Sequence, residues 1–268
     1  MATTHIAIAG LGTIGRALAR SLANGVPGLE LTGVAVRDHH KAESWLRDQG
    51  IACPILALRS LPDYADLAVE AAAADVLEAI CRPMLLAGKI VMVVSVGALL
   101  PKPELVELAR DTGGQIIVPT GALLGLDAVT AAAEGSIRSV RLTTRKPPRG
   151  LAGAPYLKAN DISVEGLDRP FCVFNGSARA AAAGFPANVN VAAALSLAGI
   201  GPDRTMVEIW ADPGVSRNCH TIDVDADSAR FTLHIENVPS ENPKTARITA
   251  LSALAALRKF HAPLRVGT

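Results

Sequence analysis

Aromatic residues are scarce in this chain of 268 residues, at 3% of the total. The core must therefore be built mainly from alanine, valine, leucine and isoleucine, in a sequence that is half hydrophobic and under one fifth charged. That balance predicts a folded globular protein. The most apolar stretches, such as residues 90–100, are too short to cross a bilayer, and we expect no membrane partner.

Neither sign of charge predominates, since the formal net charge is only +1. Such a balance excludes a general attraction to nucleic acid or to an anionic membrane surface, so any recognition of anions must be local. The N-terminus has no basic segment followed by an apolar one, which argues against a signal peptide.

Cysteines are few and far apart, at Cys53, Cys81, Cys172 and Cys219, with no C-x-x-C pair. This spacing argues against a zinc site and against a disulfide framework, and we expect no metal. It favours a reducing compartment and therefore a cytoplasmic location.

The first 123 residues alternate between strand and helix patterns. Apolar runs that read as strands lie at 5–12, 29–38, 65–72, 88–99 and 113–123, and helical patterns separate them. Continuous apolar strands separated by helices predict a parallel sheet covered on both faces. The expected fold class is α/β, with a doubly wound sheet of the Rossmann type.

From residue 124 the pattern changes to the alternation of half-buried strands. These segments lie at 135–148, 204–213, 218–225 and 229–239, and the apolar helix at 188–199 would cover them. They predict a second, α+β domain over residues 124–241, with a mainly antiparallel sheet. A final amphipathic helix is expected over 242–260, with Asn242 as its N-cap and Pro243 in its first turn.

Three glycines form G-x-G-x-x-G between the first strand and the first helix, at Gly10, Gly12 and Gly15. The first allows a tight turn, the second lets a pyrophosphate approach the backbone, and the third lets helix and strand pack closely. The helix N-terminus would face the phosphates with free amide groups. In this strand–turn–helix context the motif predicts a bound dinucleotide.

Two adjacent residues after the second strand give opposite indications about that dinucleotide. Asp38 would bind the ribose 2′-hydroxyl of NAD, whereas Arg37 could accept the 2′-phosphate of NADP. Either cofactor is permitted, and NAD is slightly favoured.

His220 lies in a strand-like segment and shares a face with Ile222 and Val224 if the strand alternates. A lone histidine on an apolar face is more often a core residue with satisfied nitrogens than a catalytic one. The residues around it leave both interpretations open.

Seven segments spread over almost the whole chain are similar to the L-aspartate dehydrogenase family. They are GLGTIG (10–15), VSVGAL (94–99), TGALLGLDA (120–128), TRKPP (144–148), FPANVNVA (185–192), N-x-H (218–220) and PSENPKT (239–245). Generic Rossmann dehydrogenases share only the first. We do not find the paired-histidine signature of dihydrodipicolinate reductase, a relative by architecture.

The resemblance implies roles for single residues. It implies that His220 is catalytic, and that Asn190 and the loop position Leu124 contact the nicotinamide cofactor. Many members carry alanine at that loop position; a backbone contact would survive the change, whereas a tight side-chain fit would not. It also implies that the C-terminal helix, residues 242–268, packs back on the first domain and completes it.

The reaction implied is NAD(P)-dependent oxidative deamination of L-aspartate, through iminoaspartate, to oxaloacetate and ammonia, or the reverse. A dicarboxylate needs cationic partners, for which Lys146 and Lys244 are the candidates, with Arg145 behind them. Imidazole can take a proton from the water that hydrolyses the imine.

Two alternatives to this activity stay open: a reductase of another small acidic amino or imino acid, and a non-catalytic dinucleotide-binding redox sensor. We also expect a homodimer, formed through an exposed face of the second sheet. The direction of the reaction and a supply of iminoaspartate to NAD biosynthesis are open as well.

Overall fold

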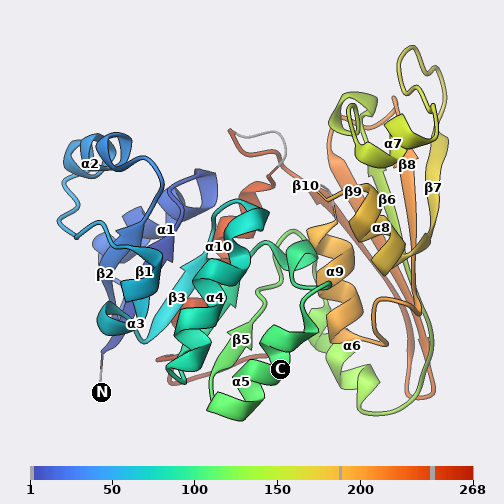
Figure 1. The fold of residues 1–268 in the computed structure, drawn as a ribbon. Helices are drawn as coiled ribbons and strands as arrows, with labels where there is room; N and C mark the ends of the chain where they lie inside the picture. Colours follow the sequence, from blue (N-terminus) through green and yellow to red (C-terminus); the bar gives the residue numbers. More distant parts are fainter. Residues whose placement is uncertain (1–2, 187–188, 242–244, 268) are drawn as a thin grey trace. The chain divides into compact units, whose positions relative to one another are not determined.

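The computed structural model describes residues 3–186, 189–241 and 245–267. It divides into two compact units (Figure 1). Unit 1 comprises Met1–Pro119 and Thr249–Arg265, and unit 2 comprises Thr120–Ile248 and Val266–Thr268.

Unit 1 contains a parallel sheet of five strands in the order β2-β1-β3-β4-β5 (Figure 1). The strands are β1 (Thr4–Ala9), β2 (Leu29–Ala35), β3 (Leu67–Glu70), β4 (Ile90–Val93) and β5 (Gln115–Ile117). The helices are α1 (Thr13–Ala23), α2 (His39–Asp48), α3 (Leu61–Tyr64), α4 (Leu77–Leu86), α5 (Pro103–Thr112) and α10 (Arg247–Lys259). The strand order reverses between β1 and β3, which places the ligand-binding crevice of this fold at their carboxyl ends.

Both faces of this sheet are buried, because successive residues of β1 belong to different hydrophobic cores. Ile6 and Ile8 pack in one core with α1, α2 and Leu257 of α10. Ala7 and Ala9 pack in the other with α3, α4 and α5. The predicted doubly wound parallel sheet is therefore confirmed.

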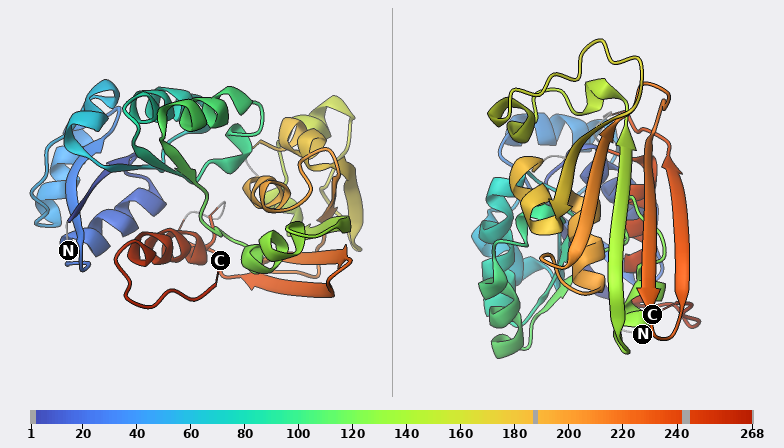
Figure 2. Two further views of the ribbon diagram at one scale, coloured as in Figure 1. Left: turned by 90° about the horizontal axis from the view of Figure 1, so that it is seen from below. Right: turned by 90° about the vertical axis from the view of Figure 1, so that its right-hand side faces the viewer.

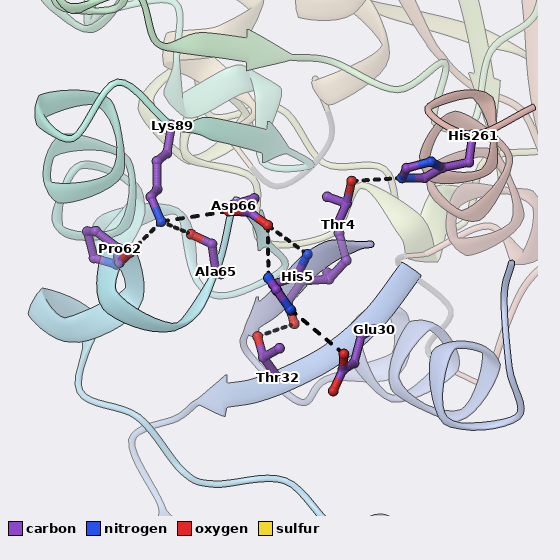
Figure 3. A network of polar contacts seen from close by, with 10 residues as sticks. Thr4, His5, Glu30, Thr32, Pro62, Ala65, Asp66, Lys89 and His261 are labelled. Atoms are coloured by element: carbon purple, nitrogen blue, oxygen red, sulfur yellow. Dashed lines mark hydrogen bonds and ion pairs between the residues drawn. The ribbon is translucent and has the colours of Figure 1, made fainter. Parts of the chain in front are cut away.

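Polar contacts secure the amino-terminal edge of the same sheet, away from the carboxyl ends (Figure 3). The backbone amide and Nδ1 of His5 lie 2.9 and 3.1 Å from one carboxylate oxygen of Asp66. The hydrogen bond from the backbone amide of His5 is the main reason that the pKa of Asp66 lies below its usual range. Thr4 Oγ1 lies 2.8 Å from His261 Nε2, so a residue shortly after α10 is held against the start of β1.

Unit 2 contains a second five-stranded sheet in the order β10-β9-β6-β8-β7, seen strand by strand in Figure 2, right. The strands are β6 (Ile137–Lys146), β7 (Phe171–Ser177), β8 (Thr205–Ala211), β9 (Asn218–Ala226) and β10 (Arg230–Asn237). The helices are α6 (Leu126–Ala133), α7 (Pro155–Ala159), α8 (Ala178–Gly184) and α9 (Asn190–Ala198). Only the β6–β8 pair is parallel, so the predicted mainly antiparallel sheet is confirmed.

One face of the second sheet is covered and the other is open. Ile222 and Val224 of β9 join Val140 and Leu142 of β6 in a core with residues of α6, α8 and α9. The intervening residues of β9 are partly exposed, apart from Cys219 near the start of the strand. The covered face is also the face of His220, as the alternation predicts.

The final helix begins later than the sequence predicts. α10 starts at Arg247, because the backbone before it forms an antiparallel bridge between Pro239 and Ala246. The amide of Arg247 donates to the carbonyl of Val238 at 3.0 Å. Asn242 and Pro243, the predicted N-cap and first-turn residues, lie outside the described residues.

Candidate functional site

The glycine motif forms the turn from β1 into α1. Gly10 has a φ of +101°, and a Cβ there would lie 2.5 Å from the carbonyl oxygen of Ala71. A Cβ on Gly15 would collide with the carbonyl oxygen of Gly10. These two positions therefore require glycine for backbone conformation and close packing.

Gly12 differs from the other two because its surroundings are open. No atom lies within 4 Å of the place that a Cβ would take. Gly12 is also the N-cap of α1, where no side chain caps the helix. Free amide groups at the start of an 11-residue helix, beside open space, fit the pyrophosphate of a dinucleotide.

A buried carboxylate, which the sequence analysis missed, joins the ends of β3 and β4. Glu70 is fully buried and pairs in register with Ala9, directly before Gly10. Its carboxylate accepts from the amides of Ala72, Val94 and Ser95 at 3.2, 3.1 and 2.8 Å. The hydroxyl of Ser95 donates to it as well, at 3.0 Å.

Glu70 therefore holds the two segments that line the carboxyl end of the sheet next to the glycine motif. Burial raises the pKa of its carboxyl, and the four donors counteract that rise. A glutamate in the otherwise apolar run LAVE was the signal in the sequence that could have revealed it.

We expect Glu70→Gln to destabilise unit 1 by about 1.5–3 kcal/mol, because a glutamine amide turns a donor toward a buried N–H group. Urea unfolding in a Trp210→Phe background checks this, since Trp45 then reports unit 1 alone. Glu78→Gln is the control: it removes only partly exposed ion pairs with Arg82 and Lys102 and should cost much less than Glu70→Gln. Equal losses in the two variants would contradict the role of Glu70.

The two cofactor-selecting candidates follow β2, and both are exposed. Asp38 is the N-cap of α2, and its carboxylate accepts from the amide of Lys41 at 3.0 Å. The position of this carboxylate is therefore fixed by the helix. Arg37 lies directly before Asp38 in the sequence.

In unit 2, the imidazole of His220 lies on the covered face of the sheet and is 3% exposed. Its cross-strand neighbour is Thr144 of β6, which is also buried. Thr144 Oγ1 lies 3.0 Å from His220 Nδ1. The sequence analysis did not single out Thr144, although its alternation with Leu142 and Lys146 along β6 could have placed it on this face.

Lys146 is the second buried ionisable side chain on this face. It lies two residues after Thr144, is 6% exposed, and burial lowers the pKa of its ammonium to about 8. The pKa of His220 falls to about 3, first through burial and then through the positive charge of Lys146. A neutral imidazole and a cation are thus held together on a covered apolar face.

Arg145 does not join this pair, because it projects to the open face of the sheet. Its guanidinium lies 3.0 Å from Asp212 Oδ2 and 4.9 Å from the ring centroid of Trp210. Arg145, the lower-ranked candidate for binding a substrate carboxylate, therefore lies on the face opposite Lys146, because successive residues of a strand point to opposite faces.

The other candidates in unit 2 are only partly described. Asn190 is the exposed first residue of α9, and Leu124 is half-buried in the loop before α6. Lys244 lies outside the described residues.

A buried amide fastens the loop that contains Leu124. Asn237 of β10 donates from Nδ2 to the carbonyl of Ala122 at 3.0 Å. It pairs in register with Asn218, two residues before His220, so it belongs to the same face. This hydrogen bond joins the loop that contains Leu124 to β10, which pairs with the strand of His220.

The described residues contain no helix long and apolar enough to span a membrane. In the same parts of the chain, no three histidine, cysteine, aspartate or glutamate side chains are grouped as metal ligands.

Two known protein families match successive parts of the chain. Residues 10–119 match the family described as "Homoserine dehydrogenase, NAD binding domain". Residues 127–260 match "Aspartate dehydrogenase, C-terminal".

Individual proteins match over nearly the full length. L-aspartate dehydrogenase 3 of Bordetella bronchiseptica is 57% identical over 98% of this chain and 97% of its own. L-aspartate dehydrogenase of Bradyrhizobium diazoefficiens is 56% identical over 98% and 94%. The crystal structure of aspartate dehydrogenase from Thermotoga maritima has a TM-score of 0.77 at 22% identity, covering 98% of this chain and 99% of that one, and so shares the fold.

Proposed function

Since this chain belongs to the L-aspartate dehydrogenase family, as the sequence motifs indicate, we propose that it oxidises L-aspartate to oxaloacetate and ammonia with a nicotinamide cofactor. The observation that carries the proposal is the buried pair of His220 and Lys146 on one face of the second sheet. A redox sensor would need the glycine motif but has no use for this pair.

Lys146 supports a substrate with carboxylate groups. Hydrogen bonds between an ammonium and a carboxylate are short and strong, and they are stronger on a face shielded from water. The substrate we propose supplies two carboxylates, of which Lys146 binds one. Lys244, which the sequence also favours for binding a carboxylate, is the second proposed partner of the substrate.

His220 supports the hydrolytic half of the reaction. We propose that its Nε2 takes a proton from water while the water oxygen bonds to Cα of iminoaspartate. The C=N bond becomes a single bond as its nitrogen takes up a proton. The proton held on Nε2 then passes to the same nitrogen, the hydroxyl loses its proton as the carbonyl forms, and the C–N bond breaks to release ammonia and oxaloacetate. Because the pKa of His220 is lowered, the ring starts each cycle neutral; a dicarboxylate beside Lys146 offsets the cationic repulsion and makes the ring a stronger base.

For the cofactor, the residues of unit 1 fit a dinucleotide. Gly10, Gly12 and Gly15 with the start of α1 would hold the pyrophosphate, and the nicotinamide, when bound, accepts the hydride from the substrate Cα. We propose NAD as the preferred form, because the fixed carboxylate of Asp38 would repel a 2′-phosphate, while Arg37 leaves NADP usable. Asn190 and Leu124 are proposed cofactor contacts on the family resemblance.

The experiment that tests this function follows nicotinamide reduction by the purified protein with L-aspartate, L-glutamate and L-alanine, using NAD⁺ and NADP⁺ in parallel. We expect reduction with aspartate alone and a higher kcat/KM with NAD⁺. Reduction with glutamate instead would favour another acidic amino acid. Binding of NADH without reduction by any substrate, and without strengthening by succinate, would favour the sensor.

We further propose that the chain forms a homodimer through the open face of the second sheet. This face presents both signs of charge, in the pairs Arg141–Glu208 and Arg138–Asp225, and such a surface can match its own copy across a twofold axis. A hollow of about 300 Å³ on it is lined in part by the exposed side chain of Met206.

Sedimentation should give twice the 27.7 kDa mass of one chain, and Met206→Lys should give single chains by adding like charge at the interface. Leu86→Lys, at an exposed site on α4, is the control and should stay dimeric. A monomeric wild type, or a dimeric Met206→Lys, would contradict the proposed face.

Two finer expectations stay predictions. All four cysteines are free thiols, which supports a reducing, cytoplasmic location. The reaction supplies iminoaspartate to NAD biosynthesis only if the imine leaves the site before water attacks it.

A further inference from the structure

We infer that Thr144 is a positioning residue that selects the tautomer of His220: its hydroxyl accepts a hydrogen bond from Nδ1–H, which leaves the lone pair on Nε2. The inference rests on the proposed role of His220, which it deepens. It assigns the working nitrogen, the partner on the other nitrogen and the direction of the bond between them.

The first step is the geometry. Thr144 and His220 are directly opposite each other on adjacent antiparallel strands, and their side chains meet at 3.0 Å between Oγ1 and Nδ1. Both side chains are 3% exposed, so the surrounding core holds them in place. With Nδ1 occupied, Nε2 is the ring nitrogen left for the reacting water.

The second step is the direction of the bond. A hydroxyl can donate or accept, so the environment decides between the two neutral tautomers. If Nδ1 accepted, Nε2 would carry the proton and could not take one from the reacting water. The positive charge of Lys146 acts on the same ring and disfavours a second N–H group on it, so the ring carries one proton, and the proposed role of Nε2 places that proton on Nδ1.

The third step concerns the kind of partner. A carboxylate at Nδ1 would stabilise imidazolium, whereas the hydroxyl of Thr144 carries no charge. The same hydroxyl can keep accepting from Nδ1–H when Nε2 gains a proton and when it loses it. The contact therefore orients the ring throughout the cycle while leaving it neutral between turnovers.

The sheet contains a matched pair for comparison. On the open face, Thr221 Oγ1 lies 2.9 Å from His234 Nδ1, and this threonine and histidine are on the neighbouring strands β9 and β10. The contact has the same chemistry, but His234 is exposed. Thr221→Val is therefore the control for the loss of a threonine hydroxyl from this sheet.

The deciding measurement is ¹⁵N NMR of the histidine rings, with the His220 signals assigned by their loss in His220→Gln. In the wild-type protein at pH 7 we expect a protonated Nδ1 and an unprotonated Nε2. Thr144→Val should move the proton to Nε2 or mix the two tautomers, Thr144→Ser should restore the wild-type pattern, and Thr221→Val should leave His220 unchanged. A wild-type ring protonated at Nε2, or an unchanged tautomer in Thr144→Val, would overturn the inference.

Kinetics give the second readout. Thr144→Val should lower kcat by about 10–100-fold, a loss as large as when a metal-binding histidine loses the group that orients it. The KM for NAD⁺ should stay constant, and Thr144→Ser should recover most of kcat. If His220→Gln proved fully active, the proposed function of His220 would fail while the tautomer assignment could still be read from the NMR signals.

Discussion

Purified His220→Ala is expected to turn over L-aspartate about 10²–10⁴-fold more slowly than the wild type, the usual contribution of a general base. The loss should fall on steady-state kcat, because water attack follows the oxidation of the substrate. A rapid first turnover, seen as a burst of reduced nicotinamide, should therefore precede the slow steady state. Stopped-flow absorbance of the nicotinamide measures both phases.

The control for this variant is His234→Ala, which removes an exposed histidine from the adjacent strand. It should keep near-normal kcat and the same thermal unfolding. Near-normal turnover of a correctly folded His220→Ala would return His220 to the alternative that the sequence left open, a histidine of the core.

Lys146→Met is expected to raise the KM for L-aspartate about 30-fold or more, equivalent to at least about 2 kcal/mol, because a desolvated carboxylate loses its cation. The KM for the cofactor should change little. Arg145→Met is the matched control, since Arg145 neighbours Lys146 in sequence but projects to the other face. Similar losses in both variants would contradict a specific role of Lys146.

The same lysine predicts a pH dependence with a definite sign. Burial lowers the pKa of Lys146 to about 8, so its ammonium is present below that pH and is lost above it. Succinate, which does not react, should inhibit well below pH 8 and progressively less well above it. The pKa of His220, at about 3, predicts no change in kcat/KM near pH 6.5. Succinate inhibition that does not vary between pH 6 and 10 would contradict this assignment.

Much of the fold could be predicted because its periodicity is regular. The continuous apolar strands of unit 1 indicate a sheet buried on both faces, and the alternating strands of unit 2 indicate a sheet buried on one face. His220 was placed on the covered face for the same reason. Strand β7 was missed, since CVFNGS within it mixes apolar and small polar residues without clear alternation.

The site was harder to predict because its geometry depends on contacts between distant segments. Thr144 and His220 are 76 residues apart, and only the register of β6 against β9 brings them together. Glu70 gains its role from amides 24 and 25 residues further along the chain. Adjacent lysine and arginine in TRKPP suggested one cationic cluster, whereas the pleat of β6 separates them.

The position of α10 after the second sheet in the sequence has a consequence for the order of biosynthesis. Ala253 and Leu257 of α10 belong to the same core as Ile6 and Ile8, and Thr4 contacts His261 across 257 positions of sequence. A ribosome therefore releases every segment of the second sheet before it releases the helix that completes the first. The sheet that carries His220 can form during translation, while the dinucleotide-binding unit must wait for α10 to emerge.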